Sequence, residues 1–557
     1  MRDNALSLRV RAAEPGPLAG APSVPASLSS VVASPAPGRE ERFVSVSQIT
    51  AGEVPGEVPG EVPGEAPGEV QAEHFDVLVA GAGISGIDAA YHLRQRCPEK
   101  SFIVLEGHES FGGTWLAQRY PGVRSDSDLY TFGYGFKPWT GPPIATGAEI
   151  LSYLGEVIDE NGLAPHIRYR HRIHSASWSS DDSRWTVEAT RTDTGERRRF
   201  VTNFLWMCQG YYRHGDGFTP DWPGMDRFSG LLVHPHTWPD DLDLGGKNVI
   251  VIGSGATAAT LVPAIAADCA HVTVVQRSPT YFYPAPNSNE VADMLRELEI
   301  PEEWVHEIVR RKILQEQQAV INLSFDQPEF LKAELIKLVR DRLPPGYDVE
   351  KHFTPRYRPW RQRIALLPDG DLLAAISAGK VTMVTDEISN FTEDGILLAG
   401  GGELAADIII TATGFNLSVL GDVELVVDGE PLDFAGTVTY RGAMFTGVPN
   451  LAWIFGYFRA SWTLRADLIC DLVCRLLEHM ASLGASKVTP RLRPEDAGMP
   501  ILPWVDSENF NPGYLMRSVD LLPKRGDKPE WQHSQDYWME KELLSRADLD
   551  DGCLVYE

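Results

Sequence analysis

Cysteine is scarce in this chain, and long apolar runs are missing. The 557 residues include six cysteines, and no two of them form a Cys-x-x-Cys motif. This spacing gives no support to a redox disulfide or a zinc ribbon, and scattered thiols are typical of a reducing cytoplasm. No stretch reaches the roughly 20 apolar residues that cross a bilayer, and no secretory signal is recognisable. We therefore expect a cytoplasmic protein without a transmembrane segment.

Positive charge is also in deficit. The chain has 50 Lys and Arg residues against 77 Asp and Glu residues, which gives a formal net charge of −27. Such a surface repels phosphates, so we expect neither nucleic acid nor an anionic membrane as the main partner. P-loop, His-Glu-x-x-His and zinc-ligand spacings are absent as well, and we therefore expect no metal site. The sequence leaves the oligomeric state open.

Proline and glycine are concentrated near the N-terminus. The tetrapeptide Gly-Glu-Val-Pro occurs three times in succession from Gly52, and Gly-Glu-Ala-Pro follows at Gly64. A proline at every fourth position removes backbone donors, and the glycines add chain entropy, so neither a helix nor a strand ladder can form. We predict that residues 1–73 are a disordered, acidic tail.

A first dinucleotide-binding turn begins the predicted folded part. The apolar run 75–80 precedes a glycine turn, residues 87–96 have helical spacing, and a second apolar run, 101–106, ends in Glu106. The glycines allow a tight turn close to a pyrophosphate, and amides at a helix start bind phosphate. A carboxylate at the end of the second strand accepts hydrogen bonds from ribose hydroxyls. We assign FAD to this unit, with the binding residues Gly81, Gly83, Ser85, Gly86 and Glu106.

A second turn repeats the plan. Strand 248–252 leads into a glycine turn, a helix over 256–267 and a strand over 271–277. This strand ends in a cation and a hydroxyl instead of an acid, which favours the 2′-phosphate of NADP. We assign NADPH to the residues Gly253, Ser254, Gly255, Ala256, Thr257, Arg277 and Ser278. The sequence therefore predicts an α/β protein with two Rossmann-like dinucleotide-binding domains, for FAD and for NADP, with a helical insertion.

A further signature lies between the two turns. It has the form F-x-G-x-x-x-H-x-x-x-W-P and consists of Phe228, Gly230, His234, Trp238 and Pro239. Upstream, Gly112-Gly113-Thr114-Trp115 continues to Arg124 and Asp126. On these segments the chain resembles the class B flavoprotein monooxygenases, specifically the Baeyer–Villiger monooxygenases, and among them the ethionamide-activating type. On its own, His234 would indicate a structural histidine; the resemblance implies a role in the linker between the domains.

The resemblance also implies an activity and a catalytic pair. It implies an enzyme that uses FAD, NADPH and molecular oxygen to insert one oxygen atom next to a ketone carbonyl, giving an ester or lactone through a C4a-peroxyflavin. Arg363 matches the family's catalytic arginine, and Asp126 matches the carboxylate that orients it. Thr114, Trp115, Arg124 and Asp126 match further cofactor-binding positions. Gln362 stands where many members have lysine, which puts one contact to NADP in doubt.

Two alternatives remain open from the sequence. One is a flavin monooxygenase that oxidises sulfur or nitrogen, and the other is a flavin-binding interaction protein without turnover. In either case we expect the same layout. The FAD-binding domain takes residues 74–215 and 386–535, and the NADP-binding domain takes 216–385 with the helical insertion at 288–345. We expect residues 536–557 to be an acidic C-terminal tail.

Overall fold

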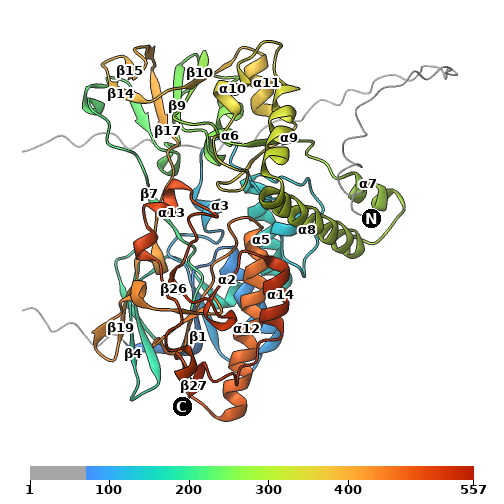
Figure 1. Cartoon of the computed structure of the whole chain (residues 1–557). Helices are drawn as coiled ribbons and strands as arrows, with labels where there is room; N and C mark the ends of the chain where they lie inside the picture. The colour runs from blue at the N-terminus through green and yellow to red at the C-terminus, as the bar shows by residue number, and fades with distance from the viewer. Residues whose placement is uncertain (1–70) are drawn as a thin grey trace, which may run out of the picture. The chain divides into compact units, whose positions relative to one another are not determined.

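Two sheets organise the part of the chain that the structure describes (Figure 1). The structure is a computed structural model, and it describes residues 71–557. The tail predicted for residues 1–73 lies outside the described residues except for its last three, where strand β1 begins at Ala72.

Strand β1 (Ala72–Ala80) lies inside the first sheet and has a parallel neighbour on each side. On one side lies β2 (Phe102–Leu105), which the chain reaches through helix α2 (Ile84–Arg96). On the other side lies β6 (Arg197–Met207). The sheet also includes β3 (Ile167–Arg168), β4 (His171–Ser179), β5 (Arg184–Arg191), β19 (Glu424–Val427), β20 (Glu430–Pro431) and β23 (Leu451–Trp453).

The second sheet has the strand order β13-β10-β9-β17-β8, and all of its pairings are parallel. Helix α6 (Ala256–Ile265) connects its first βαβ unit. Its strands are β8 (Leu231–Val233), β9 (Asn248–Ile252), β10 (His271–Gln276), β13 (Val381–Thr385) and β17 (Ile408–Thr411). The two expected dinucleotide folds are thus present.

The domain boundary expected at residue 385 is too early. Strand β17 lies beyond it, yet pairs with β9 and β8 in the second sheet. All four of its residues are buried, as in a parallel sheet that is covered on both faces, and the strand lies between β9 and β8. The intervening residues form a meander of three antiparallel strands, β14 (Ile388–Phe391), β15 (Gly395–Leu398) and β16 (Glu403–Ala405).

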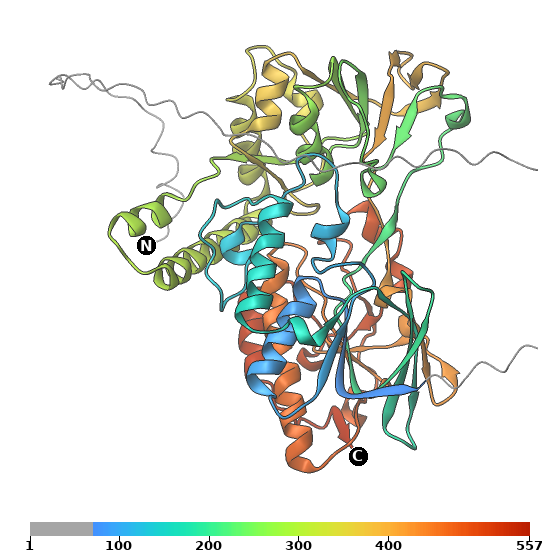
Figure 2. The ribbon, with the colours of Figure 1, turned by 180° about the vertical axis from the view of Figure 1, so that it is seen from behind.

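A two-stranded ribbon connects the two sheets. The chain leaves the first sheet through β7 (Tyr212–Gly217) and returns through β18 (Phe415–Leu417), which pairs with β7 in antiparallel orientation. Figures 1 and 2 show these crossing segments from opposite sides. A hinge between the dinucleotide-binding units would therefore have to bend at this ribbon.

Three helices occupy the stretch for which we expected an insertion: α7 (Glu290–Glu297), α8 (Glu302–Asp326) and α9 (Pro328–Arg340). The other helices are α3 (Thr114–Ala117), α4 (Leu129–Phe132), α5 (Gly147–Glu160), α10 (Val349–Phe353), α11 (Asp371–Ser377), α12 (Trp462–Leu483), α13 (Gly513–Met516) and α14 (Tyr537–Ser545). None of the helices described for residues 71–557 is both long enough and apolar enough to cross a membrane.

The remaining strands form short two-stranded pairs: β11 (Phe282–Ala285) with β12 (Ala365–Pro368), β21 (Thr439–Tyr440) with β22 (Met444–Phe445), β24 (Val488–Pro490) with β27 (Leu554–Tyr556), and β25 (Leu502–Pro503) with β26 (Lys524–Arg525).

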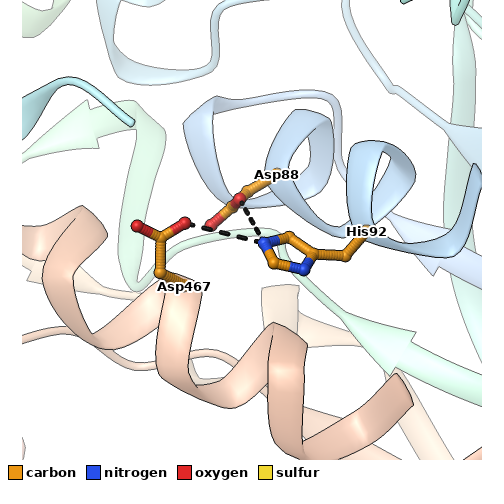
Figure 3. A group of neighbouring side chains, drawn as sticks. All are labelled: Asp88, His92 and Asp467. Atoms are coloured by element: carbon orange, nitrogen blue, oxygen red, sulfur yellow. Dashed lines mark ion pairs between the residues drawn. The ribbon is translucent and has the colours of Figure 1, made fainter. Parts of the chain in front are cut away.

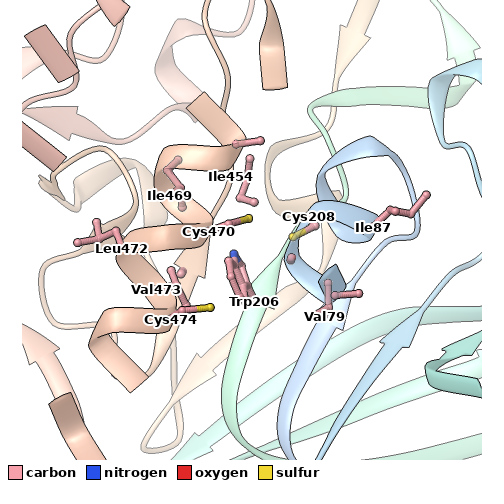
Figure 4. Close-up of a cluster of buried hydrophobic side chains, with 14 of the residues drawn as sticks. Val79, Ile87, Trp206, Cys208, Ile454, Ile469, Cys470, Leu472, Val473 and Cys474 are labelled. Atoms are coloured by element: carbon pink, nitrogen blue, oxygen red, sulfur yellow. The ribbon is translucent and has the colours of Figure 1, made fainter. Parts of the chain in front are cut away.

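The long helix α12 packs against α2 and supplies much of the first core. Its buried positions include Ile469, Cys470, Val473 and Cys474, which lie near Trp206 of β6 (Figure 4). The six cysteines are all buried and free. In this environment the thiols act as small apolar side chains.

Residues 536–557 are not a peripheral tail. Helix α14 packs on α12, and β27 pairs with β24. The acids of this segment neutralise arginines from the core: Glu540 binds Arg465 at 2.8 Å, and Asp551 binds Arg441 at 2.9 Å. The acidic composition was therefore misleading, because these charges are used inside the fold.

Candidate functional site

In the first glycine turn the backbone at Gly86 lies close to the backbone at Gly81. A Cβ placed on Gly86 would lie 1.8 Å from the carbonyl oxygen of Gly81, so no side chain fits at this position. Glu106 is buried, and its two carboxylate oxygens accept backbone N–H donors from Ala82 and His108, each at 2.8 Å. Carboxylate oxygens have further lone pairs, so Glu106 can hold the turn and still accept a ribose hydroxyl.

The residues around this turn fit a diphosphate. Helix α2 begins after Gly83 with no side chain capping its first amides and no acid in its first turn. Such a helix end favours a phosphate. Ser85 accepts a hydrogen bond from Nε1 of Trp462 at 2.8 Å. Gly113, which precedes Thr114 and Trp115 in α3, packs against Gly83, so α3 begins beside the turn.

The second turn has the same open helix end. Helix α6 begins after Gly255 without a side-chain cap, and a Cβ on Gly255 would meet no atom within 4 Å. Ala256 and Thr257 form the first turn of this helix. Ser254 contacts Thr280 through their hydroxyls at 3.2 Å. Arg277 and Ser278 are exposed directly after β10, where a 2′-phosphate could reach them.

The segment 113–128 runs from the first turn to the second unit. Gly122 packs on α6, where a Cβ would lie 2.5 Å from Cβ of Ala264. Arg124, for which we expected a cofactor contact, binds Asp371 of α11 at 2.6 Å and donates to the carbonyl of Ala259 in α6 at 3.3 Å. The guanidinium of Arg124 therefore fixes this segment to the second unit.

Asp126 lies on the same segment and meets Arg363. Nη2 of Arg363 donates to Oδ1 of Asp126 at 2.7 Å and to Oγ of Ser127 at 3.0 Å. Nε of Arg363 lies 2.5 Å from Oδ2 of Asp126, and Nη1 donates to the carbonyl of Phe458 at 3.3 Å. The structure thus brings together the two residues that we expect to be catalytic. In the sequence, Asp126 precedes the second glycine turn and Arg363 follows it.

The guanidinium of Arg363 remains charged in this site. Burial lowers its pKa, but the carboxylate of Asp126 raises it, and the pKa lies above its usual range. Three tyrosines lie near the guanidinium: Tyr514, Tyr211 and Tyr212. Burial raises the pKa of each of them, so they stay neutral hydrogen-bond donors.

Sequence reasoning missed these tyrosines. The hydroxyls of Tyr211 and Tyr212 lie 2.7 Å apart, and the ring of Tyr514 approaches Tyr212 at 5.9 Å between centroids. Tyr211 also stacks on Trp462 at 5.2 Å. The sequence shows two consecutive tyrosines where β7 begins, Tyr211 and Tyr212, but nothing in the sequence related them to Arg363.

The linker signature lies at the connecting ribbon. The ring of His234 occupies the space where a Cβ on Gly217 of β7 would be, and Nδ1 of His234 accepts the backbone N–H of His236. Burial lowers the pKa of His234. A Cβ on Gly230 would lie 2.4 Å from the carbonyl oxygen of Asp407, so this glycine allows β8 to approach β17.

The aromatic positions of the signature pack on the second unit. Phe228 contacts Phe391 edge to face at 6.4 Å. Trp238 packs against the core of the second sheet, and Pro239 follows it. The signature therefore holds the ribbon and the second sheet together, without direct contact to the Arg363 pair in the described interactions.

Comparisons with known proteins place this arrangement in a class. A family model described as pyridine nucleotide-disulphide oxidoreductase matches residues 75–336. The solved structure of an oxidized steroid monooxygenase bound to NADP matches 87% of this chain and 99% of its own, with a TM-score of 0.67 and 24% identity. A cyclohexanone monooxygenase structure matches 87% of this chain and 100% of its own, with a TM-score of 0.68 and 19% identity. At these identities the likeness shows the fold.

Sequence relatives are more similar. The FAD-containing monooxygenase EthA of Mycolicibacterium smegmatis is 45% identical over 486 residues, covering 87% of this chain and 97% of EthA. The EthA protein of Mycobacterium tuberculosis is 46% identical over 486 residues, covering 87% and 98%. This chain belongs to the family of FAD-containing monooxygenases. The resemblance to the class B flavoprotein monooxygenases is confirmed.

Proposed function

We propose that this protein is an FAD- and NADPH-dependent Baeyer–Villiger monooxygenase, which inserts one atom of molecular oxygen next to a ketone carbonyl and gives an ester or lactone. Family membership supports the flavin monooxygenase class. The ketone reaction rests on one observation, the fixed position of the Arg363 guanidinium against Asp126 of the segment 113–128.

The two turns support the cofactor assignment. Both α2 and α6 offer uncapped helix ends, and both lack acids in their first turn. Glu106 at the first unit suits a ribose with a free 2′-hydroxyl, as in FAD. Arg277 at the second unit suits the 2′-phosphate of NADPH. We propose Thr114 and Trp115 as further contacts to FAD, because α3 begins beside the first turn.

When bound, FAD accepts a hydride from NADPH and activates molecular oxygen, since such chemistry is that of the cofactor. The protein residues bind, orient and stabilise charge. Asp126, Ser127 and the carbonyl of Phe458 hold Arg363 in one direction. Among the described residues, these contacts leave one N–H of Nη1 without a partner, and it can donate to a substrate oxygen.

Arg363 would act on the carbonyl group of the substrate. When a ketone is attacked, negative charge develops on its oxygen, and a fixed cation stabilises that charge without reorganisation. Oxidation at sulfur or nitrogen develops no such oxyanion on the substrate. The geometry therefore favours ketones over thioethers and amines.

The decisive experiment compares Arg363→Ala with Arg361→Ala on a panel of ketones. Arg361 is two residues away and pairs with the exposed Glu508 at 3.3 Å, so its loss controls for charge alone. We expect Arg363→Ala to bind FAD and oxidise NADPH but to form ester at least about 100-fold more slowly, with hydrogen peroxide as the product, because one preorganised donor is worth roughly 10²–10³ in kcat. Arg361→Ala should resemble the wild type.

Two outcomes would overturn the proposal. Ester formation by Arg363→Ala at near the wild-type rate would remove Arg363 from the reaction. Sulfoxide formation from thioethers by the wild type, without ester from any ketone, would assign the site to sulfur oxidation. Gas chromatography, a peroxide assay and NADPH absorbance separate these cases. The location of the protein is a separate proposal. Free thiols are typical of a reducing compartment, and we propose that the protein acts in the cytoplasm.

A further inference from the structure

Three ionisable side chains converge where α2 packs against α12, away from the Arg363 pair. Asp88 and His92 lie one turn apart on α2, and Asp467 faces them from α12 (Figure 3). One ligand atom from each lies within 4.8 Å of the other two. Nε2 of His92 is 3.5 Å from Oδ1 of Asp88 and 3.7 Å from Oδ1 of Asp467.

These atoms have little other use in the fold. Asp88 is fully buried, and neither of its carboxylate oxygens has a hydrogen-bond partner among the described residues. Nε2 of His92 is likewise without a hydrogen bond. A buried polar group without a partner is costly, and a buried carboxylate more so. A cation bound at the point where Asp88 is aimed would offset this cost.

The protein supplies only part of that charge. Nη2 of Arg310 lies 3.8 Å from Oδ2 of Asp467, while its Nη1 donates to the carbonyls of Tyr130, Thr131 and Gly133. Oδ2 of Asp467 also accepts the backbone N–H of Gly135 at 3.4 Å. Arg310 thus approaches Asp467 at Oδ2, whereas Oδ1 is directed toward His92 (Figure 3).

We propose that Asp88, His92 and Asp467 bind one divalent transition-metal ion. Two carboxylate oxygens and an imidazole nitrogen are ligands that zinc and similar ions prefer. With metal–ligand distances of about 2.1 Å, tetrahedral ligands stand about 3.4 Å apart. The two separations from Nε2 of His92, 3.5 and 3.7 Å, are close to this value.

The site also has an entry path and a structural consequence. The side chains of His92 and Asp467 are 18% and 24% exposed, so an ion and a water ligand can reach them. Helix α2 begins at the first glycine turn, and Trp462 at the start of α12 donates to Ser85 in that turn. A metal ion at this site would link α2 to α12 close to the first glycine turn. This inference is independent of the reaction proposed above.

The test uses the full chain with FAD bound, treated with EDTA, desalted and then incubated with zinc sulfate. We expect the wild type to retain about one zinc ion per chain after a second desalting and to show a higher melting temperature in calorimetry. Asp88→Asn and His92→Gln should each weaken zinc binding at least tenfold in equilibrium dialysis. Asp88→Asn should fold, because it replaces a buried carboxylate by a neutral group of the same size.

Asp471→Asn is the matched control. Asp471 lies one turn further along α12 and joins the same two helices through Arg96, but it is not part of the cluster. It should bind zinc like the wild type. Equal zinc retention by the wild type, Asp88→Asn and His92→Gln would overturn the site, as would a wild type that holds no zinc above the background. Loss of zinc in Asp471→Asn to the same extent would show nonspecific binding to acids.

Discussion

At the scale of single residues, two arginines differ in how firmly the protein holds them. Arg363 is held by Asp126, Ser127 and the carbonyl of Phe458, so its direction is set before a substrate arrives. Arg277 is exposed after β10, and no ion pair among residues 71–557 includes it. A fixed guanidinium stabilises charge at one point, whereas a free one can adapt to a phosphate.

Arg277 provides a test of nucleotide choice. Arg277→Ala should raise the KM for NADPH roughly 10- to 100-fold, because a hydrogen bond to a charged group contributes about 1.5–3 kcal/mol. The KM for NADH should stay nearly constant, since NADH has no 2′-phosphate. Steady-state kinetics with both nucleotides measure this difference. Equal increases for the two would show that Arg277 does not contact the phosphate.

At the scale of elements, helix α14 depends on a buried ion pair. Arg465 of α12 is 0% exposed and Glu540 of α14 is 5% exposed, with Nε and Oε2 at 2.8 Å. The hydroxyl of Tyr457 also donates to Glu540 at 2.7 Å. Removal of one partner leaves the other charge buried and unpaired. The pair thus fixes the C-terminal segment to the core.

Glu540→Ala should therefore lower the free energy of unfolding by about 3–5 kcal/mol, measured by urea denaturation. Glu542→Ala is the control on the same helix, because Glu542 pairs with Arg546 on the surface. An exposed pair contributes at most about 1 kcal/mol. Similar effects of the two substitutions would show that the buried pair does not hold α14.

Helix α8 carries a histidine that should make stability depend on pH. His306 is buried, and its Nδ1 accepts the backbone N–H of Trp139 at 3.2 Å. Burial, with a smaller contribution from Arg310, lowers its pKa to about 4. The unfolded chain keeps a pKa of about 6.5. Between these values the unfolded state binds the extra proton, so stability falls as the pH falls.

The expected loss from His306 is about 1.4 kcal/mol per pH unit between roughly pH 6.5 and 4. Urea denaturation at pH 7 and pH 5 should show this loss in the wild type and a smaller one in His306→Gln. His174→Gln, at an exposed position of β4, should behave like the wild type. An unchanged pH dependence in His306→Gln would contradict the assignment.

At the scale of the whole molecule, the N-terminal repeats can be tested by truncation. A chain that starts at Val70 keeps β1 and the ion pair of Glu73 with Arg168 at 2.6 Å. Its melting temperature and FAD content should equal those of the full chain, because the Pro-Gly repeats cannot bury a core. Calorimetry and the flavin absorption band measure both quantities.

A chain that starts at Phe75 is the control for this truncation. It loses Ala72 to His74, which pair with Arg199 to Val201 of β6, and it loses Glu73. We expect a lower melting temperature for this chain. A chain from Val70 that is as unstable as the one from Phe75 would show that the preceding residues contribute to the fold.

Local patterns made the two dinucleotide units predictable. Strand, turn and helix follow one another within about thirty residues, so the periodicity and the glycines specify each unit. The strands at 248–252 and 271–277 appear as β9 and β10 with nearly the same bounds. The position of β17 was not predictable from such patterns, because an apolar strand fits either sheet until the tertiary pairing selects one.

The sequence by itself determined the family, both glycine turns and the linker signature, because each depends on residues that are close along the chain. The tertiary structure decided which distant charges meet. It paired Arg465 with Glu540, and Asp467 with the α2 residues Asp88 and His92, whereas the contact of Arg363 with Asp126 was already expected from the family resemblance. Charged side chains carry no periodic signal for their partners, and the partner becomes apparent only when burial forces the charges together.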